Sequence, residues 1–74
     1  MDKETETICI ALILYCRDVL AMPAPAKLTD SDLARLAVEY AVECGLEGAE
    51  FLDPKDPRLI ALAGAVLREI RRTQ

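Results

Sequence analysis

The chain has 74 residues, of which 53% are hydrophobic and only 4% aromatic, and its formal net charge at pH 7 is −4. A chain of this length forms one domain that buries only about 60% of its unfolded surface, so its stability is marginal unless something such as oligomerisation adds to it. A core of Leu, Ile, Val and Ala with few aromatic residues favours helices over a β-sandwich. We therefore expect an all-α fold over residues 1–74, a small bundle of three helices (about 4–22, 30–44 and 57–72) that packs as a homodimer.

The composition also argues against several kinds of site. There is no histidine, so the usual nucleophile–base pairs are lacking, and there is no Gly-rich phosphate loop. The cysteines are odd in number, and Cys9 and Cys16 would lie about 10 Å apart on one helix, too far for a disulfide. Without a C-x-x-C pair, a zinc site is not expected either. We expect no catalytic residue, no metal and no cofactor, and we expect Cys9, Cys16 and Cys44 to be small buried apolar residues.

The N-terminal residues do not resemble a targeting segment. Asp2, Glu4 and Glu6 outnumber Lys3, whereas a secretory signal begins with basic residues. The apolar run that follows is too short to span a bilayer. We expect a soluble, cytoplasmic protein, in line with the unpaired cysteines.

The most apolar stretch runs from Ile8 to Cys16 without a charged residue. Apolar residues resume after one charged pair, which makes the segment long for a strand and ordinary for a helix. Pro23 disfavours helical geometry in the residue before it, so the pattern predicts a helix from about Glu4 to Met22. A β-strand over residues 7–14 stays open as the alternative, because periodicity alone does not separate a short buried strand from a buried helix.

This first helix carries more apolar side chains than the core of a monomer needs. At 100° per residue, one side of it holds Ile8, Leu12, Tyr15, Cys16 and Val19, with Cys9 and Leu20 at the edge. Three further apolar residues fall on the polar side, where each would forgo about 1.5–3 kcal/mol of burial. We expect a second copy or another protein to cover them, and the alternative is a monomer whose long loop does so. The predicted self-association residues are Ile10, Ile13, Leu14 and Arg17.

The start of the second helix is well marked after a proline-containing connector over residues 23–28. Thr29 is a good N-cap, and Asp32 can complete a variant of the capping box. Leu28 and Leu33 flank this start at the positions of a hydrophobic staple.

The second helix is expected to end at about Cys44, with Gly45 as its left-handed C-cap and Leu46 in contact with the helix after it. The small side chains on this helix would let a neighbouring backbone approach closely, and two valines are expected to point away from the core. The inner face contains Leu33, Leu36, Ala37, Tyr40 and Cys44; the small residues are Ala34, Ala37 and Ala41; the outward ones are Val38 and Val42.

Residues 45–56 form the longest connection, which Phe51 and Leu52 are expected to pin to the core. The Asp56–Pro57 pair is a strong helix start, and Asp53–Pro54 is a rival one turn earlier. A third helix should run from Pro57 to about Arg72. Gly64 in its interior costs about 1 kcal/mol relative to Ala and indicates either a close helix crossing or a neutral replacement. The expected core stripe is Leu59, Leu62, Ala63, Val66 and Ile70, widened by Ile60, Gly64 and Leu67.

The charges are distributed unevenly along the chain. Residues 1–56 carry twelve acids and five bases, whereas residues 57–74 carry four arginines and one acid. The acids after residue 29 are explained either as helix caps on a solvated surface or as an acidic face that docks on a basic surface of another protein. For that face, the predicted partner-binding residues are Glu39, Glu43, Glu47 and Glu50.

We therefore expect a non-enzymatic protein–protein interaction module: a small acidic homodimer that acts as an inhibitor or adaptor, like accessory proteins of phages and other mobile elements. One alternative is a nucleic-acid-linked regulator, by acidic DNA mimicry or through Arg68, Arg71 and Arg72. Direct DNA binding is disfavoured, because twelve residues separate the last two helices, too many for a helix-turn-helix, and the acids repel phosphates. The other alternative is a structural subunit of a larger assembly.

Overall fold

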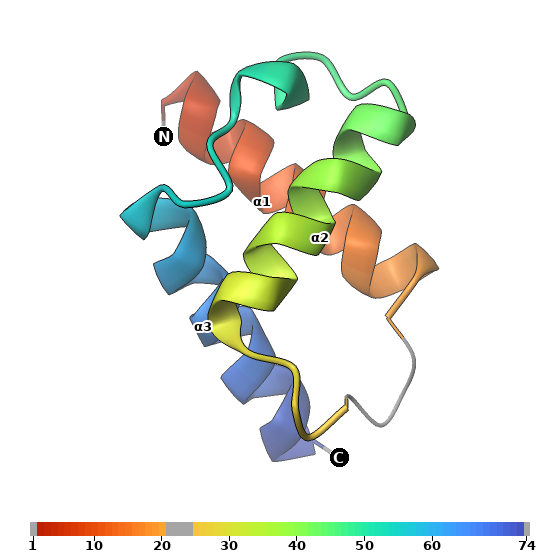
Figure 1. Cartoon of the computed structure of the whole chain (residues 1–74), viewed down its shortest axis with the longest axis vertical. Coiled ribbons are helices and arrows are strands. Elements are labelled where there is room, and N and C mark those ends of the chain that lie inside the picture. Colours follow the sequence, from red (N-terminus) through yellow and green to blue (C-terminus); the bar gives the residue numbers. More distant parts are fainter. Residues whose placement is uncertain (1, 21–24, 74) are drawn as a thin grey trace.

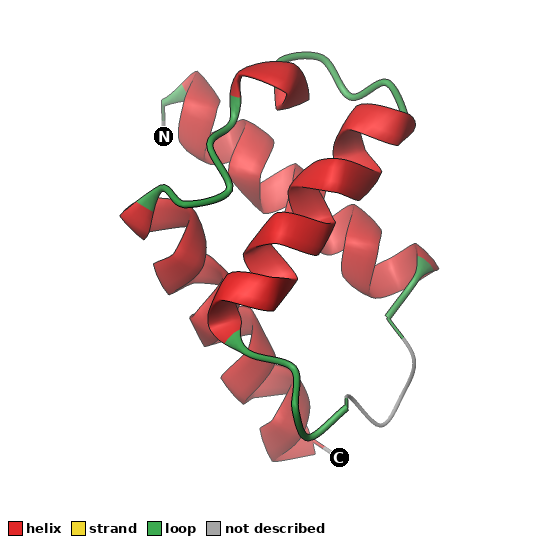
Figure 2. Ribbon diagram, in the orientation of Figure 1, coloured by secondary structure: helices red, strands yellow, loops and turns green. Residues whose placement is uncertain are grey.

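The structure is a computed structural model that describes residues 2–20 and 25–73, and all of its regular elements are helical (Figure 2). They are α1 (Lys3–Asp18), α2 (Asp30–Glu43), the short 3₁₀ turn η1 (Ala49–Phe51) and α3 (Pro57–Thr73). The three predicted α-helices are confirmed. The alternative of a strand over residues 7–14 is wrong, because the whole of that segment lies inside α1.

The three helices form two layers. α2 lies in front of the other two and crosses both, with α1 and α3 behind it (Figure 1). Packing between α2 and each of its two neighbours is extensive, whereas α1 and α3 contact each other only sparsely. As a result, α2 is the central element of the bundle, although the first helix carries the most apolar run.

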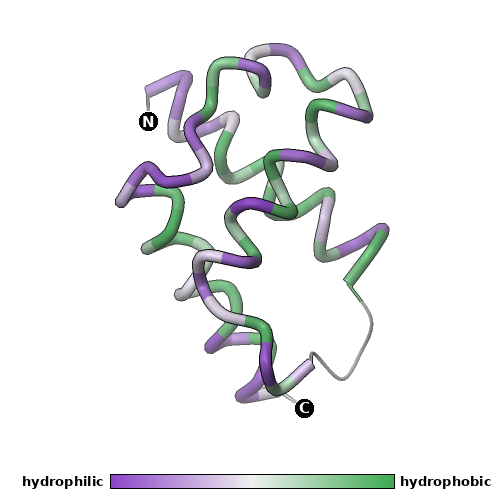
Figure 3. Tube along the Cα trace, viewed as in Figure 1, coloured by the Kyte–Doolittle hydropathy of each residue, from purple (hydrophilic) through white to green (hydrophobic). Residues whose placement is uncertain are grey.

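The core lies between α2 and the helices behind it. Hydrophobic and hydrophilic residues alternate along each helix with the helical repeat (Figure 3). The predicted small residues Ala34, Ala37 and Ala41 are fully buried, as expected for a close helix approach. The prediction for Val38 was wrong: it is only 6% exposed, because α2 packs on two helices and therefore needs a wider buried face than a helix with one neighbour. The largest fully buried side chains are Ile8, Leu12, Leu33, Leu59 and Leu67.

α1 ends at Asp18, four residues before the predicted end. The amide of Val19 and the amide of Leu20 both donate to the carbonyl of Tyr15, so the chain tightens and leaves the helix there. Leu20 then packs against the core, and this burial competes with another helical turn. Val19, predicted for the core stripe, is 46% exposed. The predicted end at Met22 and the stop at Pro23 lie outside the described residues.

Both ends of α2 form as the sequence predicts. The Thr29 hydroxyl accepts from the amide of Asp32, and the Asp32 carboxylate accepts from the amide of Thr29, which completes the capping box. At the other end, Gly45 adopts a positive φ of 76°, and its amide donates to the carbonyl of Val42. The amide of Leu46 donates to the carbonyl of Ala41, so the helix closes with both hydrogen bonds of a Schellman motif.

The connection between α2 and α3 is held by Ala49 and Leu52. Gly48, with a φ of 87°, starts the 3₁₀ turn, whose three-residue repeat places Ala49 and Leu52 on the same side. Phe51 falls off that side and is 84% exposed, so the prediction that it pins the connection was wrong, whereas the same prediction for Leu52 is confirmed.

α3 starts at Pro57, as predicted from the Asp56–Pro57 pair. The Asp56 carboxylate accepts from the amide of Arg58, and the carbonyl of Asp56 accepts from the amide of Ile60. The rival start at Asp53 is only a turn, in which the carbonyl of Asp53 accepts from the amide of Asp56. The helix has its first intrahelical hydrogen bonds at the later of the two acids.

Candidate functional site

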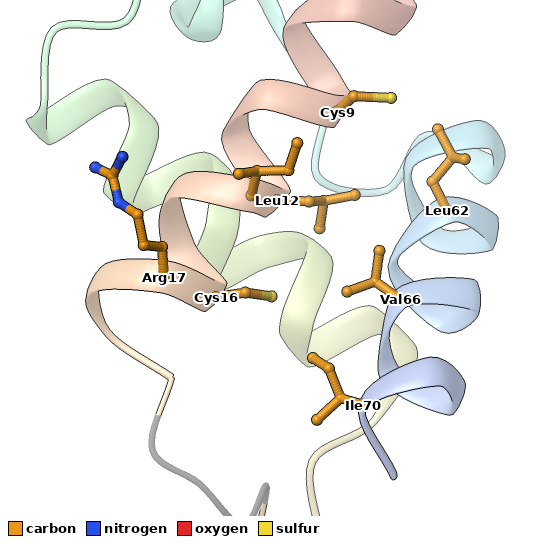
Figure 4. A pocket seen from close by; sticks show the side chains of 8 residues that line it. Cys9, Leu12, Cys16, Arg17, Leu62, Val66 and Ile70 are labelled. Carbon is orange, nitrogen blue, oxygen red and sulfur yellow. The ribbon is translucent and has the colours of Figure 1, made fainter. Parts of the chain in front are cut away.

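An open apolar groove lies between α1 and α3, on the side away from α2. It has a volume of about 490 Å³, and its α1 side chains point toward those of α3 across the gap, with α2 passing behind (Figure 4). Only Arg17 brings a charge, and its head points away from α3 (Figure 4). The lining residues are Cys9, Leu12, Ile13, Cys16, Arg17, Leu62, Val66 and Ile70.

α1 and α3 are joined by ion pairs at their N-terminal ends. Arg58 donates to the Glu4 carboxylate at 2.6 Å and lies 3.9 Å from the carboxylate of Asp2, the N-cap of α1. From there the two helices diverge toward their C-terminal ends (Figure 1). The core that α2 covers lies on one side of the diverging pair α1 and α3, and the groove lies on the other side.

α3 supplies one whole wall of the groove, which the sequence analysis did not foresee. Leu62, Val66 and Ile70 were predicted for the core stripe, but they are only partly buried and line the groove. Leu62 and Val66 also pack against the edge of the core. Leu59, Ala63 and Leu67 from the same predicted stripe are almost fully buried, as expected. The signal available in the sequence was the width of the apolar stripe on the third helix, which exceeded what one neighbouring helix needs.

The predicted self-association residues divide between the groove and the outer side of α1. Ile13 is 62% exposed and lines the groove together with Arg17. Ile10 is 37% exposed, and Leu14 is partly buried. The long loop over residues 45–56 contacts α1 through η1 and approaches it at Gly48, where an added Cβ atom would lie 3.5 Å from Oγ1 of Thr7. The loop does not line the groove, and it leaves Ile13 exposed.

The cysteines differ in their surroundings. Burial raises the pKa of the Cys16 thiol, which therefore stays neutral where it lines the groove beside Cys9. Cys44 was predicted to be buried, but it is exposed, because it is the C-cap of α2 at the point where the chain leaves the helix.

Two hydrogen bonds raise the pKa of Tyr40. The hydrogen bond with Cys44 has the larger effect, and in the other the Tyr40 hydroxyl donates to the Asp18 carboxylate at 2.8 Å.

The four predicted partner-binding glutamates are all exposed, but the structure does not bring them to one place. Glu39 and Glu43 lie on α2, where Arg35 is 3.6 Å from the Glu39 carboxylate. Glu47 and Glu50 lie on the following connection and line a second groove of about 430 Å³. The other residues that line this second groove are Lys3, Glu4, Thr7, Gly48, Phe51 and Leu52.

Two of the C-terminal arginines, Arg71 and Arg72, form hydrogen bonds or ion pairs with residues of their own chain. Arg71 donates to the backbone carbonyls of Pro25, Ala26 and Leu28, so it holds the connector before α2 against the last turns of α3. Arg72 forms an ion pair with Glu69 one turn away. This self-contact gives Arg71 a structural role that neither helix capping nor nucleic-acid binding had suggested.

Comparison with models of known protein families, with curated proteins and with solved structures gives no match to this chain. None of the helices within residues 2–20 and 25–73 has both the length and the apolar character needed to cross a membrane.

Proposed function

We propose that this chain is a non-enzymatic protein-interaction module, a small acidic homodimer that binds a partner with a basic surface and acts on it as an inhibitor or adaptor. The supporting observation is that the apolar groove and most of the acids belong to different elements. α1 and α3 form the groove, and together they carry four acids and six bases. Residues 30–56, which comprise α2 and the connection after it, carry eight acids and two bases.

This separation supports two different contacts. Apolar side chains left in water favour association through α1 and α3, because each burial contributes about 1.5–3 kcal/mol. The acidic surface repels a second acidic copy and attracts a basic partner, with an association rate that depends on salt. A homodimer joined through its apolar face would keep the acidic surfaces of both copies free for partners.

Site-specific photocrosslinking in the organism that encodes the chain tests the acidic surface. A photoreactive p-benzoylphenylalanine in place of Glu43 is expected to give an adduct with another protein. That adduct should be lost when Glu39, Glu47 and Glu50 are changed to Gln, because the charges that hold the partner are then removed. A photoreactive residue in place of Arg68, which is exposed on α3, is the matched control.

Three outcomes of this experiment would contradict the proposal. One is equal capture of the same protein from both positions, which would indicate non-specific contact. Another is no adduct with any other protein from position 43. The last is capture of nucleic acid from position 68 alone, which would favour the nucleic-acid-linked regulator instead.

A further inference from the structure

The outer side of α1 carries a pattern of charge and apolar side chains that is complementary to itself. Glu6, Ile10, Ile13 and Arg17 fall within an arc of about 60° on the helix, at 100° per residue. We call these four residues the α1 stripe. It begins with an acid, continues with two isoleucines and ends with a base about 16 Å along the helix axis. All four side chains are exposed.

We propose that two copies of this chain associate through their α1 stripes in antiparallel orientation, so that Glu6 of each copy pairs with Arg17 of the other. A two-fold axis that passes between Ile10 and Ile13 places Ile10 of each copy opposite Ile13 of the other. This is the arrangement that an isologous contact requires, since the same surface must fit itself after a half-turn. The proposal rests on the proposed function, for which it supplies the geometry of self-association.

The stripe adjoins the groove at one edge. Ile13 and Arg17 belong to the stripe and also line the groove. A second α1 that packs on the stripe therefore also buries this edge of the groove. By symmetry, the same edge is buried in the second copy.

The size of this face suits a stable dimer. Figure 1 looks down the shortest axis of the molecule, and α1 and α3 make up the broad face behind α2. The molecule measures 31 × 22 × 19 Å, so the whole of that face has an outline of about 700 Å². A dimer that uses α1 together with the neighbouring part of α3 would therefore approach the 800 Å² per partner of a standard interface. A ridged helical face has more accessible surface than its outline.

The charges disfavour contact between two copies through residues 30–56. α1 and α3 together have a net charge of +2, against −6 for residues 30–56. Contact through α1 therefore brings fewer acids of the two copies together. Arg17 uses Nε and Nη2 to donate to Asp18 of its own chain, and a guanidinium has donors at Nη1 as well. The same arginine can thus bind both carboxylates.

A charge-swap series measured by sedimentation equilibrium tests this orientation. Glu6→Arg and Arg17→Glu each place like charges opposite each other twice per dimer, and each is expected to raise the dimer dissociation constant at least tenfold. The combined Glu6→Arg/Arg17→Glu variant should return to within about threefold of the wild type. Within one chain the two positions are about 16 Å apart, so rescue cannot arise inside the monomer. Helix content by circular dichroism checks that each variant is folded.

Different results separate failure of this geometry from failure of the wider proposal. A wild type that stays monomeric at millimolar concentration overturns the dimer altogether. A dimer that persists in Ile13→Lys, or single charge swaps without effect, would show that the copies meet through another surface. Single swaps that weaken the dimer without rescue in the combined variant would overturn the antiparallel pairing alone. Capture of another protein at position 43 is read independently of all of these.

Discussion

The two broad sides of this bundle are built from similar residues but are closed to different degrees. On the α2 side, leucines and alanines of all three helices interdigitate, and Leu33, Leu59 and Ala37 are fully buried. On the other side, leucine, valine and isoleucine side chains of α1 and α3 face each other across an open groove. The difference follows from the number of layers, because one helix laid across two others can cover only one side of the pair. Most of the apolar side chains that line the second side are therefore only partly buried within a single copy.

The largest predicted effect on the free energy of unfolding comes from replacing a leucine by alanine on the closed side, and the same substitution on the open side is its comparison. Leu33→Ala removes a fully buried side chain from the core and should lower the free energy of unfolding by about 2–5 kcal/mol. Leu62→Ala removes the same atoms from the groove wall, where water already reaches the side chain, and should cost less than half as much in the monomer. Urea unfolding at low protein concentration measures both.

Equal losses of unfolding free energy in Leu33→Ala and Leu62→Ala would contradict this prediction. Equal costs at low concentration would mean that the groove is closed within one copy. If the cost of Leu62→Ala instead rises with protein concentration, the side chain is buried by association, because a partner that binds only the folded state adds to its stability.

A smaller effect is predicted at the capping box that fixes the start of α2. Thr29→Ala removes the acceptor for the amide of Asp32 and should lower the free energy of unfolding by about 1 kcal/mol. Ser31→Ala, two residues further on and exposed, is the matched control and should stay within about 0.5 kcal/mol of the wild type. Thermal or urea unfolding distinguishes the two, and a similar loss in both would mean that the capping hydrogen bond contributes nothing specific.

The third prediction concerns pH and the exposed carboxylates of α1 and the start of α3. Hydrogen bonds from the amide of Thr5 lower the pKa of Asp2, those from the amide of Arg58 lower the pKa of Asp56, and those from Arg17 lower the pKa of Asp18. A carboxyl group with a lowered pKa binds fewer protons in the folded protein than in the unfolded one. Its stabilising contribution is complete above the unfolded value of 3.8 and disappears as the pH falls through the folded value.

Unfolding midpoints in urea at pH 7 and pH 3 measure this loss. The wild type should be less stable at the lower pH, and the Asp2→Asn/Asp18→Asn/Asp56→Asn variant should show a smaller difference between the two. Glu39→Gln, Glu43→Gln and Glu47→Gln together form the control, since they remove the same number of charges from other parts of the chain. An unchanged pH dependence in the aspartate variant would assign the acid lability to other groups.

The features that the sequence predicted most accurately are helix ends whose structure is determined locally. Thr29 with Asp32, Gly45 with Leu46, and the Asp56–Pro57 pair fix helix ends through hydrogen bonds within a few residues, so their patterns are visible in the chain. The errors concern packing between helices. Val38 is buried because α2 has two neighbours, and a helical wheel drawn for one neighbour assigns it to the outside.

The candidate site was only half predictable for the same reason. The surplus on α1 at Ile10 and Ile13 was visible, because isoleucines among charged residues break the amphipathic pattern of a single helix. The α3 wall at Leu62 and Val66 was indicated only by the width of the apolar stripe on that helix, which did not tell which of its residues face α2. Which part of such a stripe faces α2 depends on the angle at which α3 diverges from α1, and no local pattern encodes that angle.

The smallest predicted effect concerns the contact between α2 and α3 at Gly64. A Cβ atom added there would lie 2.5 Å from Oδ2 of Asp30, at the N-terminus of α2, so the predicted close approach is confirmed. Gly64→Ala gains about 1 kcal/mol of helix propensity but must displace that carboxylate. We expect the two effects to cancel to within about 0.5 kcal/mol. In an Asp30→Ala background the clash is absent, so the same substitution should stabilise the protein by about 1 kcal/mol. A double-mutant cycle in urea measures this coupling. Equal effects in both backgrounds would show that the Asp30 side chain rotates away from the new methyl group at no cost, since the atoms that the Cβ would meet belong to that side chain and not to the backbone of α2.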